Sequence, residues 1–217
     1  LLRLVAGLVA PTGGTVSIAG TKVIEPREDA GIVFQAPTLL PWASILDNVL
    51  FPLDMMGKLD AAGRARAREL LALVGLSGFE SKYPRELSGG MQQRAGICRA
   101  LVHEPDILLM DEPFGALDAL TRLQVRMDLE ALWLRRRPTV LFITHSVEEA
   151  VGLSDRIFVM SPSPGVIVDE IHVELPRPRP IVLGDAPHFG AYVDRIYRQF
   201  EKMGVLHGVD AAGAPPP

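Results

Sequence analysis

The stretch Ile107-Leu108-Leu109-Met110-Asp111-Glu112-Pro113 decides the fold prediction, because four apolar residues lead directly into two adjacent carboxylates. A continuous apolar run bounded by polar residues is typical of a strand buried on both faces of a parallel sheet. Open α/β sheets bind ligands at the carboxyl ends of such strands. By chemistry, Asp111 would hold Mg²⁺, usually through water, and Glu112 would polarise a water that attacks a phosphate. The alternative is that both acids only begin a loop and cap the next helix.

The residues that follow extend this strand into a strand, helix, strand unit. Val140 to Thr144 is a second continuous apolar run. Between the two runs, apolar residues recur every three to four positions from Leu117 to Leu134, which predicts an amphipathic helix. The three arginines of 135–137 would complement the helix dipole at its C-terminal end. We therefore predict an α/β fold with a parallel sheet at its core.

Upstream of this unit, the pattern of apolar residues that predicts helices and strands is weaker. Leu1 to Leu8 resembles the end of an apolar helix that Gly7 closes. Gly14 to Ala19 and Gly31 to Gln35 are short strand-like stretches separated by turn residues, and together they predict a small β-sheet. Residues 60–76 read as an amphipathic helix with a solvated basic face.

Downstream, Ile157 to Ser161 and Val166 to Ile171 flank Ser-Pro-Ser-Pro-Gly, which predicts a hairpin. Tyr192 to Met203 could form one more helix. Gly213 to Pro217 is expected to be a frayed tail.

Composition excludes several classes of protein. The chain has 217 residues, with a small and dispersed formal net charge of −4, so a nucleic acid is not an expected partner. Its single cysteine, Cys98, rules out an internal disulfide and the common zinc frameworks, and fits a reducing cytoplasm. The apolar run Leu1 to Ala10 is too short for a membrane anchor and lacks the basic region of a signal peptide.

A second candidate site is the heptapeptide Leu87 to Gln93, which places Ser88, Gly89 and Gly90 directly before a helical stretch. The serine hydroxyl and the unencumbered glycine amides, at the positive end of a helix, suit a phosphate oxygen. The alternative is a plain N-cap followed by flexible glycines.

Taken together, these residues strongly resemble the ATP-binding cassette (ABC) ATPases. Five motifs of that family occur in the family's order: the Q-loop glutamine Gln35, the signature Leu87 to Gln93, the Walker B pair Asp111-Glu112, the D-loop Ala116-Leu117-Asp118 and the switch histidine His145. The resemblance runs from Leu1 to about Arg179. It implies a P-loop NTPase-like parallel sheet core with an antiparallel β subdomain and a helical signature subdomain.

The resemblance also implies a role for each matching residue, with ATP and Mg²⁺ as cofactors. Glu112 would be catalytic, Asp111 would bind the metal, and Gln35 would sense both Mg²⁺ and the attacking water. His145 would contact the terminal phosphate, although a lone histidine after a strand is more often structural. Nucleotide contacts in the signature and D-loop would come from Ser88, Gly89, Gly90, Gln92 and Asp118. Asp118 would lie at the interface of a homodimer, in which one signature closes over the nucleotide of the other subunit.

One family motif has no counterpart in the sequence, because no Gly-x-x-x-x-Gly-Lys-Ser/Thr string occurs. The nearest candidate, Gly57-Lys58-Leu59, lacks the first glycine and the hydroxyl. The expectation is that the chain starts inside a longer product, with the first strand and the phosphate loop (P-loop) missing. Phosphoryl transfer depends on positioning by that loop, so we expect no ATP hydrolysis by the chain as given.

Further stretches resemble one group of importers. Phe34 to Trp42, Ile45 to Val49 and Leu175 to Arg179 are similar to the nitrate, sulfonate, taurine and bicarbonate group. The resemblance implies transmembrane permease subunits, an extracytoplasmic solute-binding protein as an indirect partner, and a peripheral position on the cytoplasmic face of the inner membrane. Leu40 and Trp42 would contact a permease helix. The alternative for Trp42 is a core position.

The expected organisation is an ATPase domain over residues 1–180, with its helical subdomain at about 43–100, followed by a C-terminal helix and disordered tail over 181–217. Two other interpretations remain. One is a cassette ATPase of DNA repair or translation, which would usually carry insertions or a second cassette. The other is a non-catalytic interaction protein, against which the complete set of Gln35, Asp111, Glu112 and His145 argues.

Overall fold

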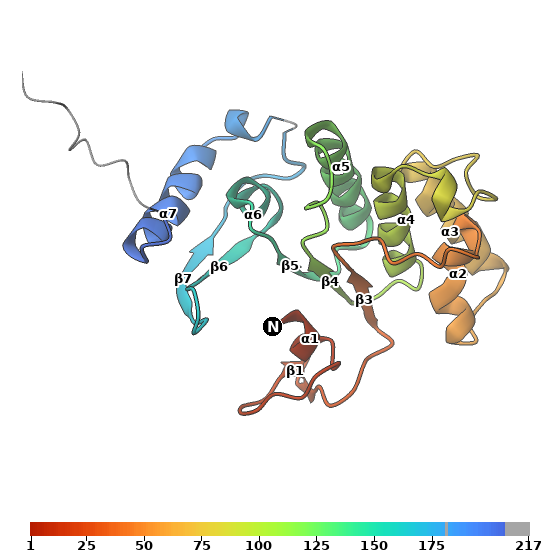
Figure 1. Ribbon diagram of the computed structural model, residues 1–217, viewed down its shortest axis with the longest axis horizontal. Helices are drawn as coiled ribbons and strands as arrows, with labels where there is room; N and C mark the ends of the chain where they lie inside the picture. Colours follow the sequence, from red (N-terminus) through yellow and green to blue (C-terminus); the bar gives the residue numbers. More distant parts are fainter. Residues whose placement is uncertain (181, 207–217) are drawn as a thin grey trace, which may run out of the picture. The chain divides into compact units, whose positions relative to one another are not determined.

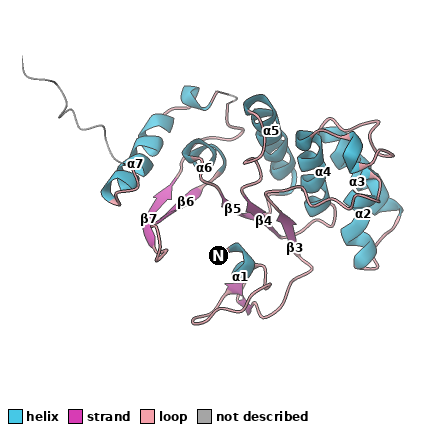
Figure 2. Cartoon of the chain, viewed as in Figure 1, coloured by secondary structure: helices cyan, strands magenta, loops and turns pink. Residues whose placement is uncertain are grey.

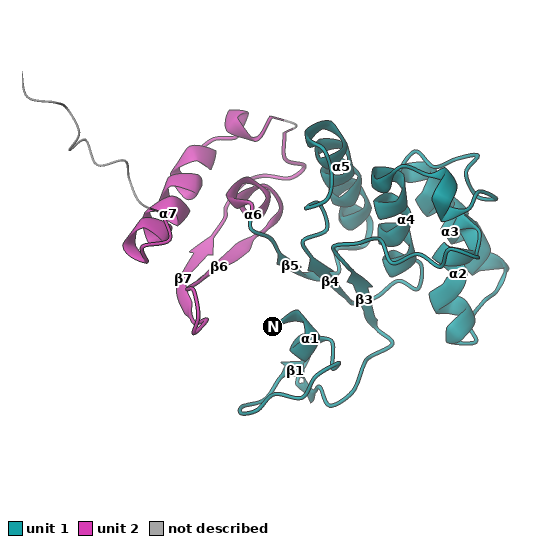
Figure 3. Cartoon of the chain, in the orientation of Figure 1, with its two compact units in different colours: residues 1–145 teal, residues 146–217 magenta. Residues whose placement is uncertain are grey.

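A computed structural model describes residues 1–180 and 182–206 of the chain (Figure 1). The chain divides into two compact units, residues 1–145 and 146–217 (Figure 3). The predicted division at residue 180 stays a prediction. In the described part of the chain, no helix is both long enough and apolar enough to cross a membrane.

The core of the first unit is a three-stranded parallel sheet in the order β3 (Ala30–Val33), β4 (Ile107–Asp111) and β5 (Thr139–Ile143). The first four residues of the central strand β4 are buried. Their side chains alternate between the two faces, and α1 (Leu2–Val5) packs against Ile107 and Leu109 on one of them. The predicted parallel sheet is confirmed. The predicted burial of its strands is confirmed for β4 and wrong for β5, whose residues Val140 to Ile143 are only half-buried.

The predicted small β-sheet is wrong in one part, because Gly31 to Val33 pairs with β4 in the parallel sheet. The reason is a close approach, since a Cβ on Gly31 would lie 2.2 Å from the carbonyl oxygen of Ala100. Of the predicted small sheet, there remains the antiparallel pair β1 (Ser17–Ile18) and β2 (Thr21–Lys22).

Apart from α1, the helices of the first unit lie on one side of this sheet (Figure 2). They are α2 (Ile45–Met55), α3 (Ala61–Leu73), the short 3₁₀ helix η1 (Pro84–Glu86), α4 (Gly89–Leu101) and α5 (Ala119–Arg136). Each of these four α-helices begins at a side chain that accepts the backbone N–H three positions on, and the four caps are Ser44, Asp60, Ser88 and Asp118. The predicted helices around 60–76, 88–103 and 117–134 are confirmed.

The second unit has its own apolar core. It contains α6 (Val147–Leu153), the antiparallel strands β6 (Arg156–Met160) and β7 (Ile167–His172), the 3₁₀ helix η2 (Leu183–Asp185) and α7 (Phe189–Lys202). Val151, Ile171 and Ile196 are central to this core. The predicted hairpin and last helix are confirmed, and the predicted frayed tail at 213–217 lies outside the described residues.

Candidate functional site

Three predicted site residues meet at one carboxylate oxygen. Gln35 donates from Nε2 to Oε2 of Glu112 at 3.3 Å, and Nδ1 of His145 lies 3.1 Å from the same Oε2. These residues follow β3, β4 and β5, whose carboxyl ends lie side by side because the strands are parallel neighbours. The side chain of His145 is 70% exposed and that of Glu112 is 32% exposed, so the group is open to solvent.

The backbone of Glu112 is strained, which fits a functional position. Its φ of 44° lies in the left-handed region that non-glycine residues seldom adopt. Hydrogen bonds hold it there, since its N–H donates to the carbonyl of Ile143 at 2.9 Å and its own carbonyl accepts from Gly115 at 3.1 Å. The alternative gave these acids the start of a loop and the cap of the next helix, and its capping part is wrong because Asp118 caps that helix.

Asp111 is the last residue of β4, where it pairs with Ile143 and is half-buried. Among residues 1–180 and 182–206, no cluster of three or more His, Cys, Asp and Glu side chains could hold a metal ion. A single strand-end carboxylate still fits Mg²⁺, which usually takes one or two protein carboxylates and completes its shell with water and phosphate oxygens.

The two glycines at the start of α4 have different surroundings. Ser88 is the N-cap, and its Oγ accepts the N–H of Met91 at 3.3 Å. Gly89 faces open space, with no heavy atom within 4 Å of a built Cβ. Gly90 is buried, and its Cβ would lie 2.2 Å from Cγ2 of Thr121 on α5. The structure therefore leaves Gly89 accessible and uses Gly90 to let two helices approach, which the sequence pattern did not indicate.

The two other signature and D-loop residues hold the backbone near them. The Nε2 of Gln92 donates to the carbonyls of Pro84 at 2.9 Å and Leu87 at 3.1 Å, and so fixes the turn before α4. Asp118 caps α5, with Oδ1 accepting the N–H of Thr121 at 3.1 Å. Hydrogen bonds from Thr121 lower the pKa of Asp118, so this carboxylate stays ionised at neutral pH.

Thr121 contacts both Gly90 and Asp118, so the signature and the D-loop lie side by side within this one chain. The described contacts thus form two groups, one centred on Glu112 and one at the starts of α4 and α5. The nearest substitute for a P-loop belongs to neither group. Lys58 follows the end of α2 and forms an ion pair with Glu28 at 2.9 Å.

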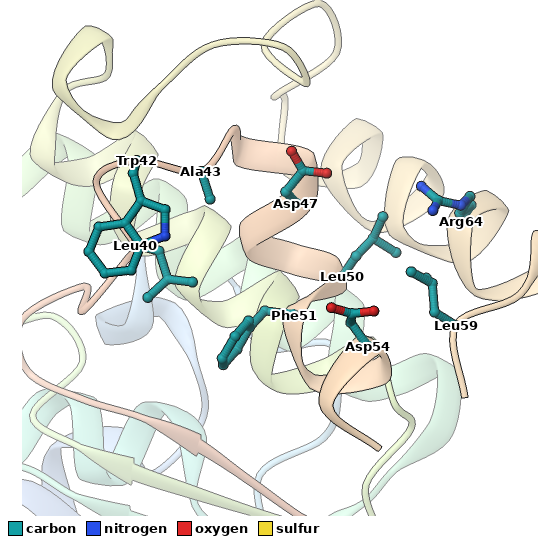
Figure 4. Close-up of a pocket in the computed structure, with 9 residues that line it drawn as sticks. All are labelled: Leu40, Trp42, Ala43, Asp47, Leu50, Phe51, Asp54, Leu59 and Arg64. Atoms are coloured by element: carbon teal, nitrogen blue, oxygen red, sulfur yellow. The ribbon is translucent and has the colours of Figure 1, made fainter. Parts of the chain in front are cut away.

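An open groove of about 410 Å³ lies beside α2 (Figure 4). Its lining comes from α2, from the loops before and after it and from the start of α3, with Leu40, Trp42, Ala43, Asp47, Leu50, Phe51, Asp54, Leu59 and Arg64 as members. Trp42 is 74% exposed, so its interpretation as a core residue is wrong.

Asn48 gives this groove its shape. It is fully buried and accepts the N–H of Leu40 at Oδ1, 2.6 Å away. Its Nδ2 lies 2.9 to 3.1 Å from the carbonyls of Leu40, Ala43 and Ser44. One side chain therefore fixes the loop that displays Trp42.

Comparisons with known proteins agree with the motif order. The family model described as ABC transporter matches residues 1–115. A taurine import ATP-binding protein of Rhizobium johnstonii is 45% identical over 210 residues, which are 97% of this chain and 80% of that protein. An uncharacterized ABC transporter ATP-binding protein of Methanocaldococcus jannaschii is 48% identical over 82% of this chain and 67% of its own length. A taurine import ATP-binding protein of Pseudomonas putida is 47% identical over 80% of this chain and 66% of its own length.

A solved structure has the same architecture. It is a dimeric ATP-binding cassette in a post-hydrolysis state, bound to ADP and Pi. It is 32% identical, with a TM-score of 0.66, and the match covers 79% of this chain and 78% of that one. The predicted fold class is confirmed. The chain therefore belongs to the ABC transporter family, as one of its ATP-binding proteins.

Proposed function

We propose that this chain carries most of the ATP-hydrolysing motor of an importer for nitrate, sulfonate, taurine or a related small solute. The observation that carries the proposal is the meeting of Gln35 and His145 at one oxygen of Glu112. A carboxylate that a glutamine amide and a histidine ring approach at the end of a parallel sheet can orient and polarise a water. The taurine import relatives support the solute class.

Each site residue has a role in this proposal. Asp111 would hold Mg²⁺, and Glu112 would polarise the attacking water. Gln35 would orient that water and sense Mg²⁺, while His145 would donate to the terminal phosphate. Bound Mg²⁺ would supply positive charge to the phosphate oxygens of ATP.

The second group acts on a nucleotide held by another copy of the chain. Ser88 and the open amide of Gly89 present hydrogen-bond donors at the start of α4, where the helix dipole favours an anion. Gln92 holds the turn before them, Gly90 keeps α4 close to α5, and Asp118 lies beside them at the copy-to-copy interface. The solved relative is dimeric, which supports a homodimer here.

The groove beside α2 is the proposed contact for a permease. Apolar side chains of its lining include Leu40, Trp42 and Phe51, and its charged side chains are Asp47, Asp54 and Arg64, with the acids in excess. A short helix with apolar and basic residues would complement this surface. The chain would then lie on the cytoplasmic face of the inner membrane, and a solute-binding protein would act only through the permease.

Trp42→Ala tests the permease contact. We expect the free energy of unfolding to change by less than about 0.5 kcal/mol, because Trp42 is largely exposed. Binding to inverted membrane vesicles that carry the permease subunits is expected to weaken about tenfold or more, as for an aromatic residue at the centre of an interface. Phe158→Ala is the matched control, since Phe158 is 45% exposed on β6, outside the groove. Equal vesicle binding by the Trp42 variant and the unaltered chain would remove the permease assignment.

This chain is expected not to hydrolyse ATP. Its residues include Glu112, which would polarise the water. Its sequence has no P-loop, whose lysine and backbone amides would hold the β- and γ-phosphates. The measurement is release of labelled phosphate from ATP by the purified chain, with and without Mg²⁺. Saturable, Mg²⁺-dependent turnover that disappears in Glu112→Gln would show that the cradle is dispensable.

A further inference from the structure

The backbone just before Gln35 is held from α4. Strand β3 ends at Val33, so the carbonyl of Phe34 lies beyond the parallel ladder. Gln93 on α4 donates from Nε2 to that carbonyl at 3.2 Å, across 59 positions of sequence. Gln93 is only 1% exposed, and a buried amide depends on such a partner because water does not reach it.

The backbone just after Gln35 is held by the same helix. Arg99 donates from Nη1 to the carbonyl of Thr38 at 2.7 Å and from Nη2 to its Oγ1 at 3.0 Å. Between these anchors, a Cβ built on Gly96 would lie 4.0 Å from Cβ of Pro37, so helix and loop are in contact there.

Gln93, Gly96 and Arg99 are spaced three residues apart, which places them on successive turns along one face of α4. That face runs along the segment that carries Gln35. The same helix begins at Ser88, so α4 joins the start of the signature to the glutamine of the Glu112 group.

We propose that Gln93 is a positioning residue for Gln35. Its bond to Phe34 fixes the backbone from which the Gln35 side chain reaches Glu112. The bond between Gln35 and Glu112 is long, at 3.3 Å, so a small shift of this backbone breaks it. Arg99 holds the other end of the same segment. This inference rests on the proposed function, in which Gln35 orients the attacking water.

The test measures the side-chain NH₂ resonances of Gln35 in the ¹⁵N-labelled chain, without nucleotide. Gln35→Glu identifies these signals by their disappearance. In Gln93→Glu, which removes the donor at nearly constant volume, we expect them to move to the position of a solvated glutamine. Hydrogen exchange of the backbone amides at 35–36 and 38 is expected to become about tenfold faster, as for loss of one anchoring hydrogen bond. Gln124→Glu is the matched control, because Gln124 is exposed on α5 and donates to Asp128 of the same helix at 2.8 Å.

A role in packing alone predicts a lower melting temperature with unchanged Gln35 signals, and that result in a folded Gln93→Glu chain overturns the proposal. If Gln93→Glu does not fold, the Gln35 signals are measured in Arg99→Gln, which changes the contact with Thr38 at the other end of the segment. Displaced Gln35 signals in that variant support the proposal, and unmoved signals overturn it. Neither readout involves ATP, so a failure of the proposed ATPase role is measured separately, by phosphate release.

Discussion

Mg²⁺-dependent ATP hydrolysis is expected to appear when a β-strand followed by a Gly-x-x-x-x-Gly-Lys-Thr loop is joined directly before Leu1. We expect a rate about 10³-fold or more above that of the chain alone, because the loop's amides and lysine supply the positioning that phosphoryl transfer needs. The added strand could pair with β5. Within the described part of the first unit, β5 is paired on one side only, by β4. Its residues Val140 to Ile143 are apolar yet only half-buried, as expected for an edge that another strand would cover.

Glu112→Gln in the joined chain separates chemistry from binding. Hydrolysis is expected to fall by about 10²-fold or more, since the amide cannot accept a proton from water, while Mg²⁺-ATP still binds. Glu201→Gln, on an exposed position of α7, should leave the rate unchanged. A joined chain that binds Mg²⁺-ATP without hydrolysing it contradicts the proposed ATPase role. Full activity in Glu112→Gln contradicts only the role of Glu112.

The central part of the fold could be predicted because its signals are local. A short apolar run followed by two acids predicts one strand. The helical period and the second apolar run after it predict a parallel neighbour, so the order of residues alone is enough. The sheet to which β3 belongs could not be predicted in this way. Gly31 to Val33 would look the same in either sheet, and the deciding contact joins Gly31 to Ala100, about seventy positions later.

The candidate site likewise has a part that the sequence predicts and a part that it does not. The meeting of Gln35, Glu112 and His145 follows from three strand ends in family order, so the motifs predict it. The bond from Gln93 to Phe34 depends on how α4 lies against the loop after β3, which no short motif encodes. The exposure of Trp42 could not be predicted either, because an aromatic residue in an apolar loop fits both a core and a contact surface.

Gly90→Ala is expected to destabilise the chain by about 2 kcal/mol, although alanine favours helices. The added Cβ would lie 2.2 Å from Cγ2 of Thr121, so α4 and α5 have to move apart or the threonine has to rotate. Urea denaturation of the variant and the unaltered chain measures the difference. Gly89→Ala, one position earlier and in open space, should change the free energy of unfolding by less than about 0.5 kcal/mol.

The cause of the destabilisation is tested by a second substitution. If the clash with the Thr121 methyl group is responsible, Thr121→Ala should recover most of the stability lost in Gly90→Ala, with a coupling energy of about 1 to 2 kcal/mol. Equal losses for the two glycine variants, or no recovery by Thr121→Ala, would mean that Gly90 is needed for backbone freedom and not for helix packing. The same pair of variants in the joined chain then separates the two glycines by function. We expect Gly89→Ala to slow hydrolysis with little change in stability, because the methyl group would occupy the open space where a phosphate of the second copy is proposed to bind.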